Sequence, residues 1–429
     1  MFFKGLVCKE LKTKTKTKTK TKTKMKTKII TEGKITLPVP DVKIVSKEMG
    51  TFYNPLMKFN RDISILFLNV LPGKIRTADP MAATGIRSLR MMKECKNISH
   101  IFANDFDKNA IKEIVKNAKK NKINCKVLKK IPQEKKIKKQ IYLFTMDATN
   151  FLLESKGFNY IDIDPFGSPN PFLDATVKRV SRGGYIAITA TDTAALCGTY
   201  EQACKRKYDA KPIRNFMMHE VGLRILAKKV QTIGAQYDKA MTPVFSFSKD
   251  HYMRIFFRCE KGKEAVDTII KEQGYILFCT NCLSLQKSSK NTRICCEKEM
   301  DYAGRLWLGN LWDKEIIKGM IKNTQEIEKK KTQEQKMQKG MQEKNKKQKT
   351  DYEELLAFLK IISTEEETKT FQVYDLSKIA KKYKLSLKKI DYVIQELTEK
   401  KFAASRTHII NQGIRTDAPV EEIVKILKE

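Results

Sequence analysis

The chain has 429 residues, of which 41% are hydrophobic, and its formal net charge at pH 7 is +36. This length can bury a full core in two or three domains, and no apolar run approaches the roughly 20 residues of a membrane span. The start, Met1-Phe2-Phe3-Lys4, has no signal-peptide apolar region, and most of the ten cysteines are scattered, so a cytoplasmic protein with reduced thiols is predicted. The charge favours a polyanionic partner such as nucleic acid over a general enrichment in lysine, and no obligate protein partner is inferred.

The first segment in chain order is a low-complexity tail. Residues 12–28 are an almost perfect Lys-Thr repeat with no apolar face and strong self-repulsion. Residues 1–35 are therefore predicted to be disordered, and ordered structure is expected to start near Ile35.

Residues 36–265 alternate short β-rich runs with helical segments, which is typical of a parallel sheet with crossover helices. The predicted strands are Lys74–Asp79, His100–Asn104, Gln140–Thr145, Tyr160–Asp164 and Gly184–Ala190, and the predicted helices are Gly85–Lys96, Lys108–Asn121 and Pro171–Val180. Two further runs, Pro243–Ser248 and His251–Arg258, follow without an intervening helix. Such a closing hairpin predicts an α/β, Rossmann-like class I methyltransferase domain that uses S-adenosylmethionine. A dehydrogenase is disfavoured because the chain has no G-x-G-x-x-G fingerprint at the first strand's exit.

The character of the chain changes after Lys261. Residues 266–322 hold a cysteine cluster and both tryptophans, and residues 323–350 are a Lys/Gln/Glu-rich linker, either mobile or helical. Residues 351–429 return to amphipathic helices, at Asp375–Tyr383 and Leu387–Lys400, with a strand pair expected within Ala403–Ile409. The prediction is a C-terminal α+β domain with a winged-helix-like RNA-binding module.

Acidic residues end four of the predicted strands: Asp79, Asp105, Asp147 and Asp164. In a doubly wound sheet the ligand lies at this carboxyl edge. Asp105 follows the second strand, where a carboxylate can hold ribose hydroxyls, and Asp147 follows the third, where it can meet an adenine edge. Each alone could be a helix cap, but four together predict a cofactor pocket.

The run Asp164-Pro165-Phe166-Gly167 suits methyl transfer to an amino nitrogen. The carboxylate of Asp164 and the carbonyl of Pro165 can accept hydrogen bonds from an exocyclic amine, and Phe166 can stack on the base that carries it. Taken alone, the run would be an ordinary turn after a strand. The alternatives are a DNA adenine or other RNA amino-methyltransferase, and a non-catalytic nucleic-acid-binding regulator.

Longer stretches make the function more specific. They occur in the order Phe52–Asp62, Asp79–Arg90, Asn104-Asp105, Asp164–Pro169, Thr191–Tyr200, Lys207–Leu223, Gly304–Gly309, Ala404–His408 and Gly413–Ala418. Together they resemble the tRNA (guanine-26, N2)-dimethyltransferase family of archaea and eukaryotes, over most of the chain outside the charged linker. The resemblance implies S-adenosylmethionine-dependent dimethylation of the N2 amine of guanine 26 in tRNA.

The resemblance also implies roles for single residues. The positions that match the family's S-adenosylmethionine-binding residues are Arg61, Arg87, Asp105, Asp147 and Ala148. Asp164 matches the catalytic carboxylate, and Phe52 and Phe166 match aromatic residues that sandwich the target guanine.

Four cysteines form a candidate metal site. Cys279 and Cys282 make half of a zinc-ribbon pattern, and Cys295 and Cys296 could supply the other half. The family pattern has two CxxC pairs, whereas here Arg293 stands at the third ligand position and adjacent ligands are geometrically awkward. One structural zinc and four free thiols therefore both remain open, and a catalytic zinc is not expected.

The C-terminal module is expected to grip tRNA. Arg406, His408 and Arg415 are candidates for phosphate or base contacts. A basic face is formed by Lys381, Lys382, Lys384, Lys388 and Lys389.

Overall fold

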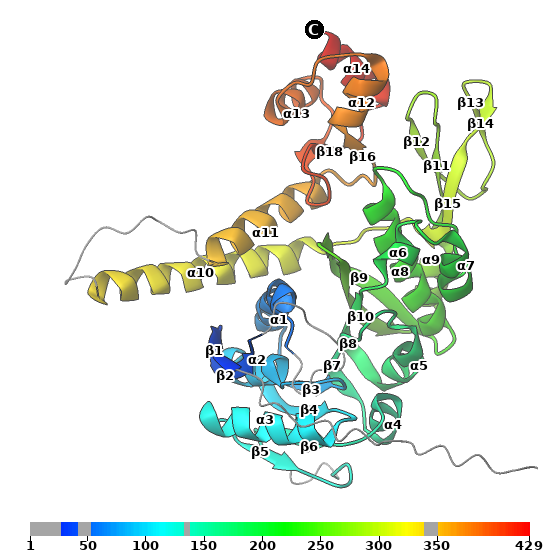
Figure 1. The fold of residues 1–429 in the computed structure, drawn as a ribbon. Helices are drawn as coiled ribbons and strands as arrows, with labels where there is room; N and C mark the ends of the chain where they lie inside the picture. Colours follow the sequence, from blue (N-terminus) through cyan, green and yellow to red (C-terminus); the bar gives the residue numbers. More distant parts are fainter. Residues whose placement is uncertain (1–26, 42–52, 133–137, 339–350) are drawn as a thin grey trace, which may run out of the picture.

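The computed structural model describes residues 27–41, 53–132, 138–338 and 351–429. Its centre is an eight-stranded sheet with the order β5-β6-β4-β3-β7-β8-β10-β9 (Figure 1). These strands are β3 (Ile75–Asp79), β4 (Ile98–Asn104), β5 (Cys125–Val127), β6 (Ile141–Phe144), β7 (Phe158–Ile163), β8 (Val180–Ala190), β9 (Lys239–Lys249) and β10 (Tyr252–Lys261). β10 runs antiparallel to both β8 and β9, whereas the other pairs are parallel. The Rossmann-like sheet and its closing hairpin are therefore confirmed.

Helices cover both faces of this sheet. α1 (Lys58–Val70), α2 (Ile86–Glu94) and α3 (Lys108–Lys120) lie on one side, and α4 (Ala148–Glu154), α5 (Asn170–Arg179) and α8 (Met218–Ala235) lie on the other (Figure 1). Because both faces are covered, β3 and β6 are buried at every residue, as their apolar runs require. The shorter elements are η1 (Pro55–Met57), α6 (Thr193–Leu196), α7 (Glu201–Tyr208) and α9 (Lys263–Lys271).

An N-terminal hairpin corrects the predicted extent of the tail. β1 (Thr27–Glu32) pairs antiparallel with β2 (Ile35–Pro40), although residues 27–35 were expected to be disordered. The reason is the alternation of Ile35, Leu37 and Val39, which are all buried and give β2 one apolar face against α2 and α3. The rest of the predicted tail, residues 1–26, lies outside the described residues.

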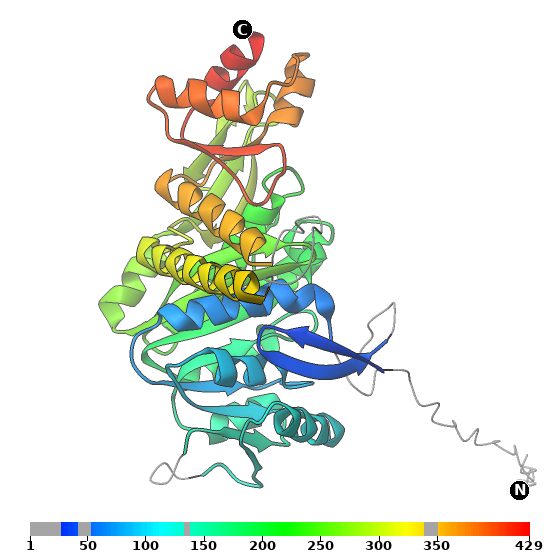
Figure 2. The ribbon, with the colours of Figure 1, turned by 90° about the vertical axis from the view of Figure 1, so that its left-hand side faces the viewer.

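The cysteine-containing part is a small sheet followed by a long helix. β11 (Gln273–Phe278) lies between β12 (Leu285–Ser288) and β15 (Asp301–Trp307), and β13 (Ile294–Cys295) pairs with β14 (Lys298–Glu299). α10 (Lys314–Gln338) continues into the segment expected to be a linker and packs alongside α1 and α11 (Figure 2). Residues 339–350 lie outside the described part of the chain.

The C-terminal module begins with α11 (Asp351–Glu367). It continues through β16 (Val373–Asp375), α12 (Leu376–Tyr383), α13 (Ile390–Glu399), β17 (Ala404–Arg406), β18 (Gly413–Thr416) and α14 (Val420–Lys428). The two strands expected within Ala403–Ile409 are wrong in their bounds, because the partner of β17 follows only after a loop of six residues, 407–412. This order of elements is compatible with a winged-helix-like module. Among the described helices, none combines the length and the apolar character needed to cross a membrane.

Candidate active site

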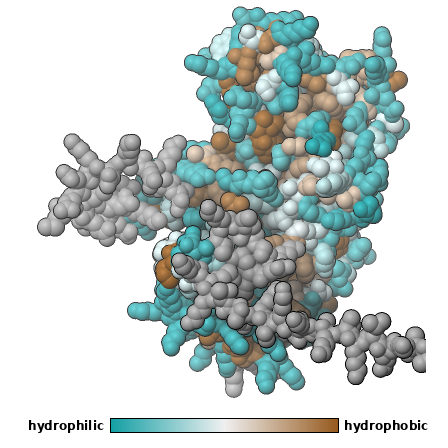
Figure 3. All heavy atoms as spheres, viewed as in Figure 1, coloured by the Kyte–Doolittle hydropathy of each residue, from teal (hydrophilic) through white to brown (hydrophobic). Residues whose placement is uncertain are grey.

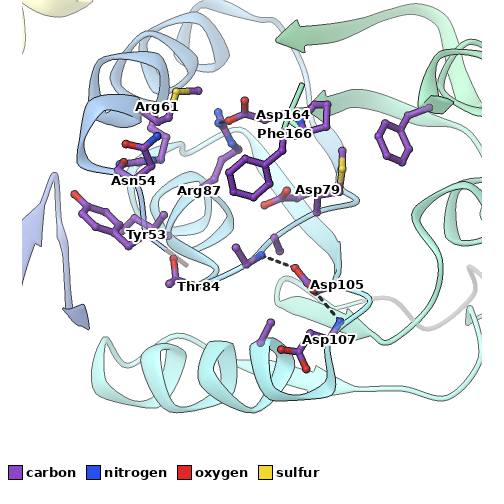
Figure 4. A pocket seen from close by; sticks show the side chains of 18 of the residues that line it. Tyr53, Asn54, Arg61, Asp79, Thr84, Arg87, Asp105, Asp107, Asp164 and Phe166 are labelled. Carbon is purple, nitrogen blue, oxygen red and sulfur yellow. Dashed lines mark hydrogen bonds and ion pairs between the residues drawn. The ribbon is translucent and has the colours of Figure 1, made fainter. Parts of the chain in front are cut away.

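A cavity of about 510 Å³ opens at the carboxyl ends of β3, β4 and β7 (Figure 4). This is the edge at which the strand-end acids were predicted to meet. Of the predicted site residues, the structure brings these together in its lining: Arg61, Arg87, Asp105, Asp164, Pro165 and Phe166. Tyr53, Asp79 and Asp107 line it as well.

Asp105 ties two strand ends together. One oxygen of its carboxylate accepts a hydrogen bond from the backbone N–H of Ala83 at 2.8 Å, and the other accepts one from Asp107 at 2.9 Å (Figure 4). Ala83 follows β3 in the left-handed region, with φ 49°, so the turn presents its N–H to the carboxylate. Partial burial raises the pKa of Asp105 above its ordinary value.

Asp164 follows β7 and is held by Arg87. One Asp164 oxygen, Oδ2, accepts from Nη2 of Arg87, and the guanidinium's other nitrogen donates to Asp162 at 3.3 Å. Arg87 is only 7% exposed, so its charge lies between two carboxylates with little water. A buried ion pair of this kind fixes geometry, and removing one partner leaves an unpaired buried charge. The ion pair with Arg87 therefore fixes the orientation of the Asp164 carboxylate at the cavity.

A second arginine supports this pair from the sheet. Arg254 of β10 donates to the two oxygens of Asp162 at 3.1 and 2.7 Å, and the Tyr160 hydroxyl adds a bond of 2.7 Å. Burial alone would raise the pKa of Asp162, but Arg254 and Arg87 outweigh it and hold the pKa below its ordinary value. Asp162 is thus ionised and bridges the two arginines.

Asp79 is an acid of the cavity whose burial is only partly offset by nearby positive charge and hydrogen bonds. It is 3% exposed, and the Ser88 hydroxyl donates to it at 2.7 Å. Burial raises its pKa to about 7, against the opposing effect of Arg87. A cation placed in the cavity would favour its ionised form.

The N-terminal hairpin contributes to the same cavity through Glu32. This carboxylate accepts from Nε and Nη2 of Arg61, both at 2.7 Å, and from the Tyr53 hydroxyl at 2.9 Å. Arg90 donates to it at 2.8 Å from the opposite side. Glu32 therefore sets the orientation of two residues that line the cavity, Arg61 and Tyr53.

Two predicted cofactor-binding residues are not in the cavity lining. Asp147 caps the N-terminus of α4, accepting from the N–H groups of Thr149 and Asn150, and Ala148 is the first residue of that helix. Both follow β6, next to β4 at the same edge of the sheet. Phe52 lies outside the described residues.

Sequence reasoning missed Glu32, Tyr53, Asp162 and Arg254. A signal was present for two of them, because Asp162 and Arg254 each interrupt an apolar strand, between Ile161 and Ile163 and between Met253 and Ile255. A charge in such a strand requires a buried partner of opposite sign.

The four cysteines do meet. Their sulfur atoms all lie within 4.8 Å of one another, and no other group of three or more potential metal ligands occurs among the described residues. Sγ of Cys282 is 3.6 Å from that of Cys295, which is 3.9 Å from that of Cys296. Cys296 has a φ of 51°, and this left-handed turn lets adjacent cysteines point to one centre.

Two of the expected tRNA contacts are wrong. The side chains of His408 and Arg415 are fully buried, because each is paired with Glu365, at the junction between the C-terminal module and α8. Arg415 also donates to Glu220 of α8 at 2.7 Å. Arg406 is exposed but paired with Asp391 at 2.8 Å. Arg415 therefore links the module to the methyltransferase domain, and His408 does so by accepting a hydrogen bond from the backbone N–H of Ser248 in β9 at 3.4 Å.

Comparison with known proteins shows the family of the chain. The model of the family "N2,N2-dimethylguanosine tRNA methyltransferase" matches residues 33–428. A tRNA (guanine(26)-N(2)/guanine(27)-N(2))-dimethyltransferase of Aquifex aeolicus is 37% identical over 418 residues, spanning 94% of this chain and 96% of the relative. A tRNA (guanine(26)-N(2))-dimethyltransferase of Methanobrevibacter smithii is 35% identical over 413 residues, spanning 94% of this chain and 97% of the relative.

A solved structure extends the likeness to three dimensions. Trm1 from Pyrococcus horikoshii, in complex with S-adenosyl-L-methionine, superposes with a TM-score of 0.76 and 31% identity, covering 94% of this chain and 100% of the other. The chain belongs to the N2,N2-dimethylguanosine tRNA methyltransferase family.

Proposed function

We propose that this chain transfers methyl groups from S-adenosylmethionine to the N2 amine of guanine 26 in tRNA, giving the monomethyl and then the dimethyl nucleoside. The observation that carries the proposal is Asp164, with Pro165 and Phe166, at the cavity of a chain of this family. The substrate follows from the family and from the names of the relatives at guanine 26.

Asp164 supplies what the chemistry needs. The N2 lone pair of guanine is delocalised into the ring, so this amine is a poor nucleophile. S-Adenosylmethionine, when bound, supplies an electrophilic methyl group on its sulfonium sulfur. Oδ1 of Asp164 has no hydrogen-bond partner among the described residues, while Oδ2 is held by Arg87, so Oδ1 can accept an N2–H. That hydrogen bond directs the lone pair toward the methyl group and lets Asp164 take the proton.

Phe166 and Pro165 would position the base. The Phe166 side chain is 48% exposed at the rim, where an extruded guanine can stack on it. Stacking offsets the few kcal/mol that leaving the RNA helix costs. The Pro165 carbonyl would accept the second N2–H in the first transfer. Phe52 would cover the other face of the base, as its match to the family implies.

The cavity fits the cofactor. The carboxylate of Asp105 would accept hydrogen bonds from the ribose hydroxyls, and Asp147 and Ala148, after the neighbouring strand β6, would lie toward the adenine. Arg61 and Arg87 offer guanidinium groups to the amino-acid carboxylate, and the poorly compensated Asp79 suits its ammonium group. The carboxylate and the ammonium group of the cofactor would thus each have a partner of opposite charge.

We further propose that one structural zinc is held by Cys279, Cys282, Cys295 and Cys296. Tetrahedral zinc with Zn–S bonds of about 2.3 Å separates its sulfurs by about 3.8 Å. The distances of 3.6 and 3.9 Å agree with that spacing. Purified protein is expected to contain one zinc per chain by elemental analysis, and Cys279→Ser to lose it. Protein without zinc, grown in zinc-supplemented medium, would contradict this assignment.

Replacing Asp164 by Asn tests the catalytic role. The variant is expected to bind S-adenosylmethionine as the wild type does, while kcat on tRNA falls by roughly 100- to 10,000-fold. Asp107→Asn is the matched control, because Asp107 also lines the cavity and asparagine caps a helix as well as aspartate. Wild-type kcat in Asp164→Asn would overturn the assignment.

A further inference from the structure

A second cavity, of about 660 Å³, lies between the methyltransferase domain and the C-terminal part. Its walls come from the segment before α8, the end of β11, α12 and the loop after β17. The residues that matter here are Arg214, Phe216, Phe278, Lys378, Lys382 and Ile409. Apolar atoms gather on the surface where the C-terminal module meets the rest of the molecule (Figure 3).

An aromatic residue forms part of the floor. Phe216 is partly exposed, and its ring meets Phe278 edge-on, with centroids 5.6 Å apart at 82°. The Tyr374 ring lies 6.2 Å from it on another side. These neighbours hold Phe216 in place while it still lines the cavity. A fixed, partly exposed ring is a suitable platform for a planar base.

The rim is positively charged and largely uncompensated. Arg214 and Lys378 are exposed, and neither has an ion-pair or hydrogen-bond partner through its side chain within the described residues. Lys382 donates to the carbonyl of Thr280 at 3.1 Å. The one carboxylate in the lining, that of Asp375, is engaged in capping α12. The cavity therefore attracts anions.

The chain connects this cavity to the catalytic loop. The hydroxyls of Ser168 and Tyr208 lie 3.0 Å apart, and the side chain of Asn170 donates to the carbonyl of Lys207 at 2.8 Å. The segment from Lys207 runs on directly to Arg214 and Phe216. Arg206, at the end of α7, adds another exposed cation with no partner in the described part of the chain. The segment that leads from the catalytic loop to the cavity wall thus carries exposed cations at Arg206 and Arg214.

We propose that this cavity binds an unpaired nucleotide of the tRNA whose target guanine is presented to Asp164. Arg214 and Lys378 contact its phosphates, and Phe216 stacks on its base. The inference rests on the proposed function and adds where the rest of the tRNA is held. Unpartnered cations beside a fixed aromatic ring are the pattern that binds unstacked RNA, which is why RNA is favoured over an acidic peptide.

The test compares two variants of equal charge in the full-length protein. Arg214→Ala/Lys378→Ala removes the rim cations, and Lys112→Ala/Lys120→Ala removes two exposed lysines of α3, at the far end of the molecule from the C-terminal module (Figure 1). Binding of fluorescent tRNA is measured by anisotropy over a range of salt concentrations. The rim variant is expected to bind at least roughly tenfold more weakly and to show a shallower salt dependence than the control.

Phe216→Leu separates stacking from charge. It is expected to weaken tRNA binding roughly tenfold with an unchanged salt slope, while the affinity for S-adenosylmethionine stays at the wild-type value. Rim and Phe216 variants that bind tRNA like the control would overturn the inference and leave an acidic peptide as the candidate ligand. The binding assay does not depend on turnover. A wild-type protein that binds tRNA but methylates no guanine would therefore contradict the proposed function and leave the inference about the second cavity standing. A wild type that fails to bind tRNA would overturn both.

Discussion

Glu32→Gln is expected to weaken cofactor binding, although Glu32 itself does not line the cavity. Its carboxylate accepts hydrogen bonds from Arg61, Tyr53 and Arg90. Each of the two carboxylate oxygens accepts two of these bonds. A glutamine turns one acceptor oxygen into an NH2 donor, which faces an arginine or the tyrosine hydroxyl whichever way the amide is oriented. Arg61 then loses its fixed position at the cavity.

The magnitude follows from the charge environment. Burial raises the pKa of Glu32, but hydrogen bonds and charges of Arg61 and Arg90 outweigh it and lower the pKa to about 2, from about 4.5. That fall corresponds to roughly 3 kcal/mol, at about 1.4 kcal/mol per pKa unit. Since the folded-state pKa is depressed, this stability is fully present above about pH 4.5 and is lost as the pH falls toward 2. Glu32→Gln should remove a similar amount at neutral pH.

Isothermal titration calorimetry with S-adenosylmethionine measures how the substitution changes the affinity for the cofactor. Loss of the proposed charged hydrogen bond from Arg61 to the cofactor would raise the Kd roughly 10- to 100-fold. Glu94→Gln is the matched control, because Glu94 also pairs with Arg90, at 2.9 Å, and is nearly buried, but contacts no residue of the cavity lining. Both variants should lose thermal stability, and only Glu32→Gln should lose affinity. Equal affinities in the two variants would refute the reasoning.

Three further changes address other parts of the network. Asp162→Asn leaves Arg254 without its buried counter-charge and should destabilise the fold by about 3–5 kcal/mol, measured by chemical unfolding; a loss below about 1 kcal/mol would show that the cluster is not coupled. Asp79 has a pKa near 7, so binding of the cationic cofactor should release a proton at pH 7, seen as a buffer-dependent enthalpy that Asp79→Asn abolishes; a buffer-independent enthalpy in the wild type would contradict this. Arg415→Ala removes the ion pair to Glu220 across the junction, leaving Glu220 paired, among the described residues, only with Arg224 of its own helix, and should make the C-terminal module more susceptible to limited proteolysis; an unchanged cleavage pattern would argue against the role of Arg415 in holding the module.

The sequence predicts those parts of the fold that depend on the local pattern of apolar and polar residues. Strand–helix alternation and the run of two strands around Lys249 predict the sheet and its hairpin, because burial of both faces demands apolar strands. Asp105 and Asp164 were found for the same reason, since strand ends meet at one edge of such a sheet.

The rest depends on pairings between distant segments. Glu32 contacts Arg61 across 29 positions, Arg254 contacts Asp162 across 92, and Arg415 contacts Glu220 across 195. No periodicity shows which acid neutralises which base. Arg415 and His408 were therefore only candidates for tRNA contacts, with packing the commoner role of a lone histidine, and the structure pairs both of them inside the protein. For the four cysteines the sequence left a zinc site and free thiols both open, because adjacent ligands looked geometrically awkward. The structure brings the four sulfurs within 4.8 Å of one another, with a left-handed turn at Cys296.

The most direct test of the central claim is nucleoside mass spectrometry of an unmodified tRNA transcript incubated with the protein and S-adenosylmethionine. We would compare three transcripts that differ only at positions 26 and 27. One has guanine at position 26 alone of the two, one at position 27 alone, and one at neither, because one relative's name includes position 27. We expect N2-methylguanosine followed by N2,N2-dimethylguanosine, from the transcript that keeps guanine 26. Protein that binds S-adenosylmethionine but leaves guanine 26 unmodified would contradict this expectation.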